Sequence, residues 1–218
     1  MVRRRLSWLL VYSAAMAFVE SAVVVYLRQI YYPGGFSFPI VIIPDRLSAI
    51  EVGREAATLL MLLAVSFLVG SDRWERFLAF CFCFGVWDIF YYVWLWVFLR
   101  WPPSLLTWDI LFLIPVPWIG PVLAPVLVSI SLVAGSVWLL RARERGARLA
   151  FPLWQWGLAT AGGIGVLLSF MLDWPVVLDG REPPPFRWWL FCFGLALGVS
   201  AVGFAARTMA PVRRERIR

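Results

Sequence analysis

Carboxylates that interrupt long apolar stretches are the residues of this sequence best suited to chemistry. Glu20, Glu51, Glu55 and Asp88 each lie among Leu, Val, Ala and Phe residues, and Asp109 lies in a shorter apolar stretch rich in tryptophan and proline. An acidic residue at the centre of a membrane helix costs about 2.5 to 3.5 kcal/mol on insertion scales. We therefore expect these five groups to face the protein interior and to take a partner or a proton.

Helical spacing places some of these acids beside other polar groups. Glu51 and Glu55 are four residues apart and share a helix face, and Arg54 is three residues from Glu51 and can pair with it. Asp88 shares a face with two tyrosines. The candidate polar network comprises Glu20, Arg28, Glu51, Arg54, Glu55, Asp88, Tyr91, Tyr92, Arg100 and Asp109.

This network has a structural and a functional interpretation. The acids and Arg28, Arg54 and Arg100 could form a fully paired network that only holds helices together. Alternatively, the surplus of acid over arginine invites a proton, a cation or a small cationic ligand. Calcium or magnesium would suit carboxylates, but no spaced ligand motif is present. A proton-sharing dyad of Asp88 and Asp109 is a further alternative, although neither Trp-Asp dipeptide matches a protease signature.

The absence of histidine removes several kinds of site. The chain itself cannot supply imidazole ligands for haem or zinc, nor a Ser-His-Asp arrangement. Cys81, Cys83 and Cys192 lie in apolar stretches without CxxC spacing, which predicts small core residues. We expect no cofactor. The open alternative is a cation bound by the carboxylates.

Composition points to lipid as the main solvent. Hydrophobic residues make up 62% of the 218 residues and charged residues 15%, far from the soluble average. The net charge of +7 comes from arginines that flank apolar stretches, whereas a nucleic-acid surface needs a basic soluble face. The expected partners are the lipid bilayer and other membrane subunits, not nucleic acid.

Six apolar stretches approach the roughly 20 residues that a helix needs to cross a bilayer. They predict one all-α membrane domain over residues 1–218, a polytopic transmembrane helical bundle with spans at about 6–27, 47–69, 77–99, 119–140, 154–172 and 188–206. The first stretch resembles a signal peptide, with Ala15-Met16-Ala17 as a cleavage-like site. Because apolar residues continue to Leu27, we favour an uncleaved helix.

Arginine placement predicts the orientation of these spans. Loops on one side of the predicted membrane hold 14 of the 20 arginines, and those on the other side hold Arg28, Arg46, Arg54, Arg100, Arg181 and Arg187. The positive-inside rule then puts both termini in the cytoplasm, with the protein in the cytoplasmic membrane. All five acids of the network would lie in the outer half.

Two outer connections are too irregular to cross the membrane. Residues 28–46 contain several glycines and prolines and predict a lid-like loop. In the outer segment 100–118, Pro115 and Pro117 must break any helix. We expect a short helix there before the fourth span, either interfacial or re-entrant, with the interfacial form favoured by its tryptophans.

Small residues concentrate in the last two predicted spans. Gly162, Gly163 and Gly165 lie in the fifth, and Gly194 and Gly198 have GxxxG spacing in the sixth. This pattern predicts close packing of these helices.

The sequence does not decide whether the protein is an enzyme. The leading hypothesis is a non-enzymatic complex subunit or small translocation module whose acidic pocket, in the outer half of spans one to three, binds a cation, a proton or a small ligand. One alternative is an integral-membrane enzyme that acts on a lipid-like substrate from the outer leaflet. The other is a purely structural or assembly subunit.

Overall fold

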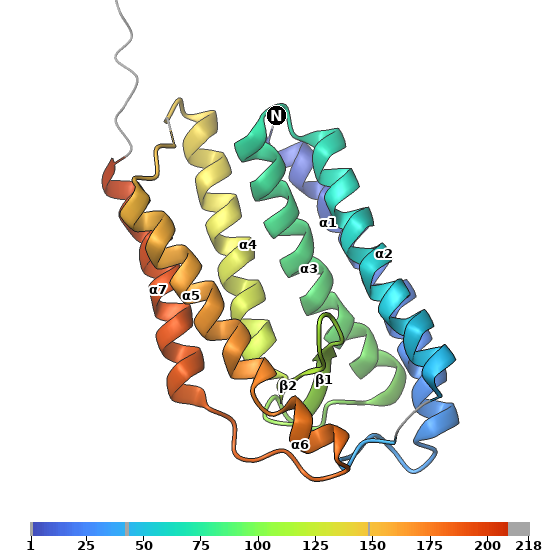
Figure 1. The fold of residues 1–218 in the computed structure, drawn as a ribbon. Coiled ribbons are helices and arrows are strands. Elements are labelled where there is room, and N and C mark those ends of the chain that lie inside the picture. Colours follow the sequence, from blue (N-terminus) through green and yellow to red (C-terminus); the bar gives the residue numbers. More distant parts are fainter. Residues whose placement is uncertain (1, 42–43, 148, 209–218) are drawn as a thin grey trace, which may run out of the picture.

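The computed structural model describes residues 2–41, 44–147 and 149–208. Most of the chain is helical (Figure 1). The elements are α1 (Val2–Tyr31), α2 (Asp45–Val69), α3 (Arg73–Leu99), β1 (Trp108–Phe112), β2 (Trp118–Pro121), α4 (Leu123–Glu144), α5 (Leu153–Met171), α6 (Trp174–Leu178) and α7 (Trp188–Thr208).

Six helices are long and apolar enough to cross a membrane, which confirms a multi-pass membrane protein. They are α1, α2, α3, α4, α5 with its continuation α6, and α7. The start of α1 and the end of α7 lie at the same end of the bundle, the top of Figure 1. We call this the arginine-rich end and the opposite one the hairpin end. Arg148 and the arginines from Arg213 onward, which belong to the orientation count, lie outside the described residues.

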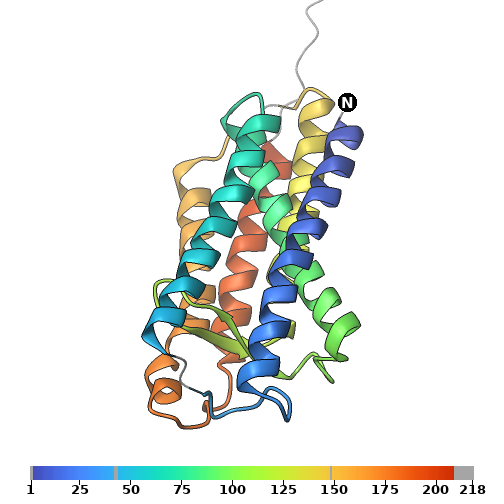
Figure 2. The same cartoon turned by 90° about the vertical axis from the view of Figure 1, so that its right-hand side faces the viewer.

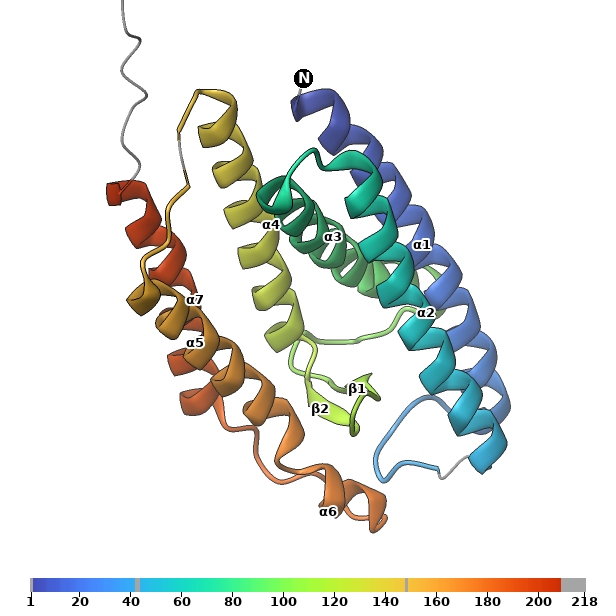
Figure 3. The same ribbon diagram turned by 45° about the horizontal axis from the view of Figure 1, so that its top comes forward.

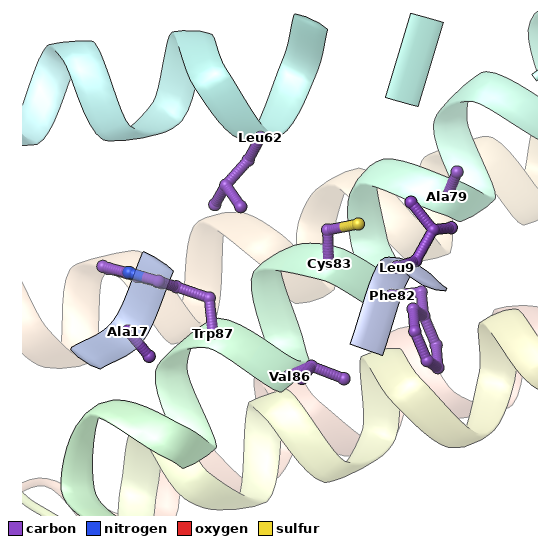
Figure 4. Close-up of a cluster of buried hydrophobic side chains, with 8 residues drawn as sticks. All are labelled: Leu9, Ala17, Leu62, Ala79, Phe82, Cys83, Val86 and Trp87. Atoms are coloured by element: carbon purple, nitrogen blue, oxygen red, sulfur yellow. The ribbon is translucent and has the colours of Figure 1, made fainter. Parts of the chain in front are cut away.

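Helix α3 is the centre of the first half of the bundle. Helices α1, α2 and α4 all pack against it (Figures 1 and 2). Where α1, α2 and α3 meet, buried side chains such as Leu9, Leu62 and Phe82 form an apolar cluster (Figure 4). Cys81 and Cys83 are buried, as expected, but Cys192 is exposed on α7. The expectation of a core position was wrong for Cys192, because an apolar residue in a membrane helix can equally face lipid.

Helices α5 and α7 form a closely packed pair, as predicted from their glycines. A Cβ atom added to Gly162 would lie 2.7 Å from the backbone oxygen of Gly194, and one added to Gly194 would lie 2.8 Å from that of Gly162. Hydrogen side chains therefore let the two backbones touch. The pair joins the rest of the protein through α4 and through β2.

The connection before α4 is a β-hairpin, so the expected interfacial or re-entrant helix was wrong. Strands β1 and β2 pair antiparallel, with Asp109 opposite Gly120. The fourth span consequently begins at Leu123 and not near residue 119. Prolines at three positions of residues 115–121 lack an amide donor, and the intervening β-branched and aromatic residues favour extended backbone. The hairpin lies between α2 and α3 on one side and α5 on the other (Figure 3).

The loop after α1 folds back over the hairpin end. The hydroxyl of Tyr32 accepts a hydrogen bond of 2.8 Å from the Val41 amide. The ring of Phe36 packs edge-on against Tyr32 and Trp101. Residues 42–43 of the predicted lid-like loop lie outside the described residues. The loop thereby covers the end of α1 at Arg28.

Candidate functional site

Arg54 is the central residue of a buried charge cluster between α1 and α2, where it pairs with two acids. Its Nη1 forms an ion pair with Glu20 of α1. Its Nε and Nη2 atoms lie 3.0 and 2.9 Å from one oxygen of Glu51, one helical turn earlier on α2. The side chains of Glu20 and Glu51 are 5% and 7% exposed. Sequence spacing predicted the Arg54–Glu51 pair, whereas the pairing with Glu20 depends on how α1 packs against α2.

Thr58 belongs to this cluster, although sequence reasoning missed it. Its hydroxyl donates to Glu20 Oε1, while Arg54 takes the other oxygen. Thr58 is almost completely buried. The available signal was its position, four residues after Arg54 and hence on the same face of α2. Glu20 therefore has a protein donor on each carboxylate oxygen.

Glu55 differs from the other two acids because its hydrogen-bond partner is neutral. Its Oε2 accepts a hydrogen bond of 2.8 Å from the backbone amide of Leu113, at the tip of the β-hairpin. The residue is buried. Within the described part of the chain, no arginine nitrogen lies within ion-pair distance of Glu55. Glu55 thus links α2 to the hairpin, a contact that sequence spacing could not reveal.

Arg28 and Asp109 form a second buried pair, 2.8 Å apart, that joins α1 to β1. The Arg28 guanidinium carbon lies 3.8 Å from the centre of the Trp101 ring and 4.5 Å from that of Phe36. The two rings therefore shield the pair from water and add cation–π attraction. Burial raises the pKa of Asp109 to about 6, although Arg28 acts in the opposite direction.

Asp88 stands apart from the Arg54 cluster. The hydroxyl of Ser129, on α4, donates to its Oδ2 at 2.8 Å. The described structure shows no hydrogen bond between Asp88 and Asp109, each of which has its own partner. The hydrogen bonds of the described structure thus join Asp88 and Asp109 to different partners, Ser129 and Arg28. Ser129 was missed, because it lies on a different helix and carries no local signal.

Tyr91, Tyr92 and Arg100 all lie against aromatic rings. Tyr92 is buried, and its ring lies 5.1 Å from that of Tyr91 and 6.4 Å from that of Trp101. The backbone oxygen of Tyr91 accepts from the Ser21 hydroxyl at 3.0 Å. Arg100 ends α3 in a left-handed conformation with φ of 53°, and its guanidinium carbon lies 4.4 Å from the Trp96 ring centre. Arg100 is exposed and does not join the carboxylates.

The charge balance follows from these pairings. Arg28 balances Asp109, while Arg54 alone faces Glu20 and Glu51 with Glu55 nearby. Across residues 2–41, 44–147 and 149–208, no three acids or cysteines lie close enough together to hold a metal ion. The predicted surplus of acid thus concentrates around Arg54.

Two surface cavities of the described structure lie away from these acids. One, of about 350 Å³, lies beneath the loop after α1 and is lined by Arg28, Tyr32, Phe36, Trp101 and their neighbours. The other, of about 460 Å³, is a groove along the second half of α4. The Arg54 cluster is instead packed within protein.

No family model, no curated protein and no solved structure matches this chain.

Proposed function

We propose that the protein is a non-enzymatic multi-pass membrane protein that binds and releases a proton at Glu55. The observation that carries the proposal is the charge count around Arg54: three buried carboxylates face one guanidinium. With all three ionised, the cluster would hold two uncompensated negative charges. A charge inside the membrane is expensive unless it is paired. Binding of a proton removes part of this cost.

A proton fits this cluster better than a divalent cation does. Calcium needs six to eight oxygen ligands at about 2.3 to 2.6 Å, and magnesium needs near-octahedral geometry. The acids of the described residues do not converge in that way. A proton needs a single carboxylate oxygen.

Glu55 is the acid of the three with the weakest electrostatic support. Glu20 has Arg54 and Thr58 as donors, and Glu51 receives two guanidinium nitrogens. Glu55 has the Leu113 amide, which is neutral. Hydrogen bonds between a charged and a neutral group stabilise the charge less than an ion pair with similar geometry does. We therefore assign the exchanging proton to Glu55.

Proton binding at Glu55 would change the hydrogen bond between Glu55 and the hairpin. An ionised carboxylate accepts a stronger hydrogen bond than a protonated one. Protonation of Glu55 would therefore weaken the attachment of the Leu113 amide to α2. Such proton-linked movement of the hairpin suits a small translocation module or a regulatory subunit of a membrane complex.

The positive-inside rule favours an orientation for this activity. The first residues of α1 and α3 and the last turn of α4 with Arg145 carry most of the described arginines, and all of these lie at the arginine-rich end (Figure 1). We propose that this end faces the cytoplasm, in the cytoplasmic membrane. Glu55 lies in the half of α2 nearer the hairpin end and would exchange its proton from the outer side.

Infrared difference spectroscopy tests the proposal directly. The full chain in lipid nanodiscs is measured between acidic and alkaline buffer, in H2O and in D2O. We expect protonated-carboxyl stretching bands that appear on acidification and shift in D2O, with one component lost in the Glu55→Gln variant and the component of Asp109 retained. Glu182→Gln is the matched control, since Glu182 is exposed at the hairpin end, and it should leave the bands unchanged.

Two outcomes would contradict the assignment. If the bands of Glu55→Gln, Glu20→Gln and Glu51→Gln were all the same as those of the unmodified protein, the cluster would stay ionised and be only structural. A component that survives in Glu55→Gln but is lost in Glu20→Gln or Asp88→Asn would move the proton to another acid. Thermal unfolding of each variant confirms that the bundle is still folded.

The enzyme alternative has less support in the described residues. A lipid-like substrate would need a cavity that reaches an acid and opens to the bilayer. The loop cavity and the α4 groove do not contain Glu20, Glu55 or Asp88, and Glu20 and Glu55 are already held by protein donors. The assembly-subunit alternative predicts the same ion pairs without proton exchange, and the infrared experiment separates it from the proposal.

A further inference from the structure

A groove on the second half of α4 combines apolar and cationic lining. It has a volume of about 460 Å³ and is lined by residues of α4 and its C-cap: Val133, Ala134, Val137, Trp138, Arg141, Ala142 and Arg145. These positions recur every three or four residues and form one stripe of the helix. From Val133 to Arg145 the chain advances by twelve residues, or about 18 Å at 1.5 Å per residue. The stripe ends at the arginine-rich end of the bundle, where α4 lies beside α1 (Figure 2).

The two arginines of this groove have no ion-pair partner among the described residues. Nearby arginines do: Arg143 pairs with Asp72, and Arg5 pairs with Glu75. The neighbouring acid on α4, Glu144, accepts a hydrogen bond from the Val2 amide at the start of α1. Arg141 and Arg145 are four residues apart on one face, where like charges repel. An anion between them would relieve that repulsion.

The chemistry of the groove changes along its length. Val133 and Val137 line the part nearer the middle of the membrane, and they also pack against the apolar cluster of α1, α2 and α3. Trp138 follows, 39% exposed, and an indole suits the boundary between acyl chains and headgroups. The arginines come last, at headgroup level. Guanidinium groups bind phosphate oxygens through paired hydrogen bonds.

We propose that this groove binds an anionic phospholipid, with its phosphate between Arg141 and Arg145 and an acyl chain along Val133 and Val137. A free phosphate would use the arginines but leave the apolar part of the groove empty. A zwitterionic lipid would fill the groove but add a positive headgroup beside two guanidinium groups. The combination of lining residues favours a lipid with net negative charge. This inference is independent of the proton assigned to Glu55.

Lipid binding to the purified full chain tests the proposal. Native mass spectrometry in detergent is titrated with dioleoyl phosphatidylglycerol, dioleoyl phosphatidylcholine or inorganic phosphate. We expect phosphatidylglycerol to bind at least about tenfold more tightly than phosphatidylcholine, and phosphate to bind weakly, since each arginine at the surface contributes to anionic lipid attraction.

Variants separate headgroup from acyl-chain recognition. Arg141→Gln with Arg145→Gln should weaken phosphatidylglycerol binding at least about tenfold and remove the preference over phosphatidylcholine. The control, Arg46→Gln with Arg181→Gln, makes the same change in net charge at exposed positions of the hairpin end and should not alter binding. Ala134→Phe, at an exposed position, should fill the apolar part and weaken binding of both lipids.

Three results would overturn the proposal. One is equal binding of the two lipids by the unmodified chain. Another is an equal loss of phosphatidylglycerol binding in the control variant, which would show a non-specific charge effect. The third is tight binding of inorganic phosphate alone, which would make the site an anion site without a lipid. Thermal unfolding of the lipid-free variants shows whether each is folded.

Discussion

Arg28 and Asp109 bind each other 2.8 Å apart although 81 residues separate them, and the pair joins the end of α1 to the first strand of the hairpin. Both side chains are at least nine-tenths buried, and Trp101 and Phe36 cover the guanidinium group. The hairpin is thus attached to the first two helices twice, once by this pair and once by the Glu55–Leu113 contact.

Removing one member of the Arg28–Asp109 pair should destabilise the protein strongly. Arg28→Gln leaves a buried carboxylate without its cation, and we expect a loss of about 3 to 5 kcal/mol in the free energy of unfolding. The double variant Arg28→Gln with Asp109→Asn should lose less than the sum of the two single variants, because it leaves no uncompensated charge. Unfolding in mixed micelles measures both, with exposed Arg46→Gln as control. Strict additivity of the two single effects would contradict the pairing.

Asp109 also gives the protein a specific pH dependence. Burial raises the pKa of Asp109 from 3.8 to about 6, so the folded state holds this proton more tightly than the unfolded state does. Its contribution to stability is complete below pH 3.8 and is lost as the pH rises through about 6. Over this window, Asp109→Asn should gain stability relative to the unmodified protein, and the difference should level off at higher pH.

The measurement is the free energy of unfolding at a series of pH values for both proteins. Asp45→Asn serves as the control, since Asp45 is exposed at the start of α2. A difference between Asp109→Asn and the unmodified protein that stays constant with pH would show that Asp109 titrates at the same pH in both states.

Gly162 and Gly163 are adjacent but should tolerate alanine very differently. A methyl group at Gly162 would lie 2.7 Å from backbone atoms of α7 and would force the helices apart, whereas one at Gly163 meets nothing within 4 Å. We expect Gly162→Ala to cost about 1 to 3 kcal/mol, as for overpacked cores. Gly163→Ala should be neutral or slightly stabilising, because alanine is the better helix former. Thermal unfolding of the two variants checks this, and similar midpoints would contradict the close contact.

The helices and the local ion pairs were predictable, because their signals lie within one element. Long apolar stretches predicted the six spanning helices, and the three-residue spacing predicted the pair between Glu51 and Arg54. The β-hairpin was not foreseen, since its length and tryptophans are equally typical of an interfacial helix. Contacts such as Glu55 with Leu113 depend on where that hairpin lies.

Asp72 is predicted to stabilise the start of α3 mainly as an N-cap. Its Oδ1 accepts from the amides of Trp74 and Glu75 at 2.8 and 3.0 Å, and its other oxygen pairs with Arg143. Asp72→Ala should cost about 1 kcal/mol. Asp72→Asn keeps a good capping side chain and loses the ion pair with Arg143, which is worth at most about 1 kcal/mol because Asp72 is half exposed.

The pH dependence of the Asp72 variants has the opposite sign to that of Asp109. The amide of Glu75 and the guanidinium of Arg143 lower the pKa of Asp72 below 3.8. The stabilisation by ionised Asp72 is therefore present above pH 3.8 and is lost as the pH falls through the lowered pKa. Unfolding measurements should show the unmodified protein approaching Asp72→Asn in stability only at strongly acidic pH. If Asp72→Ala and Asp72→Asn were equally stable at neutral pH, the cap would contribute nothing.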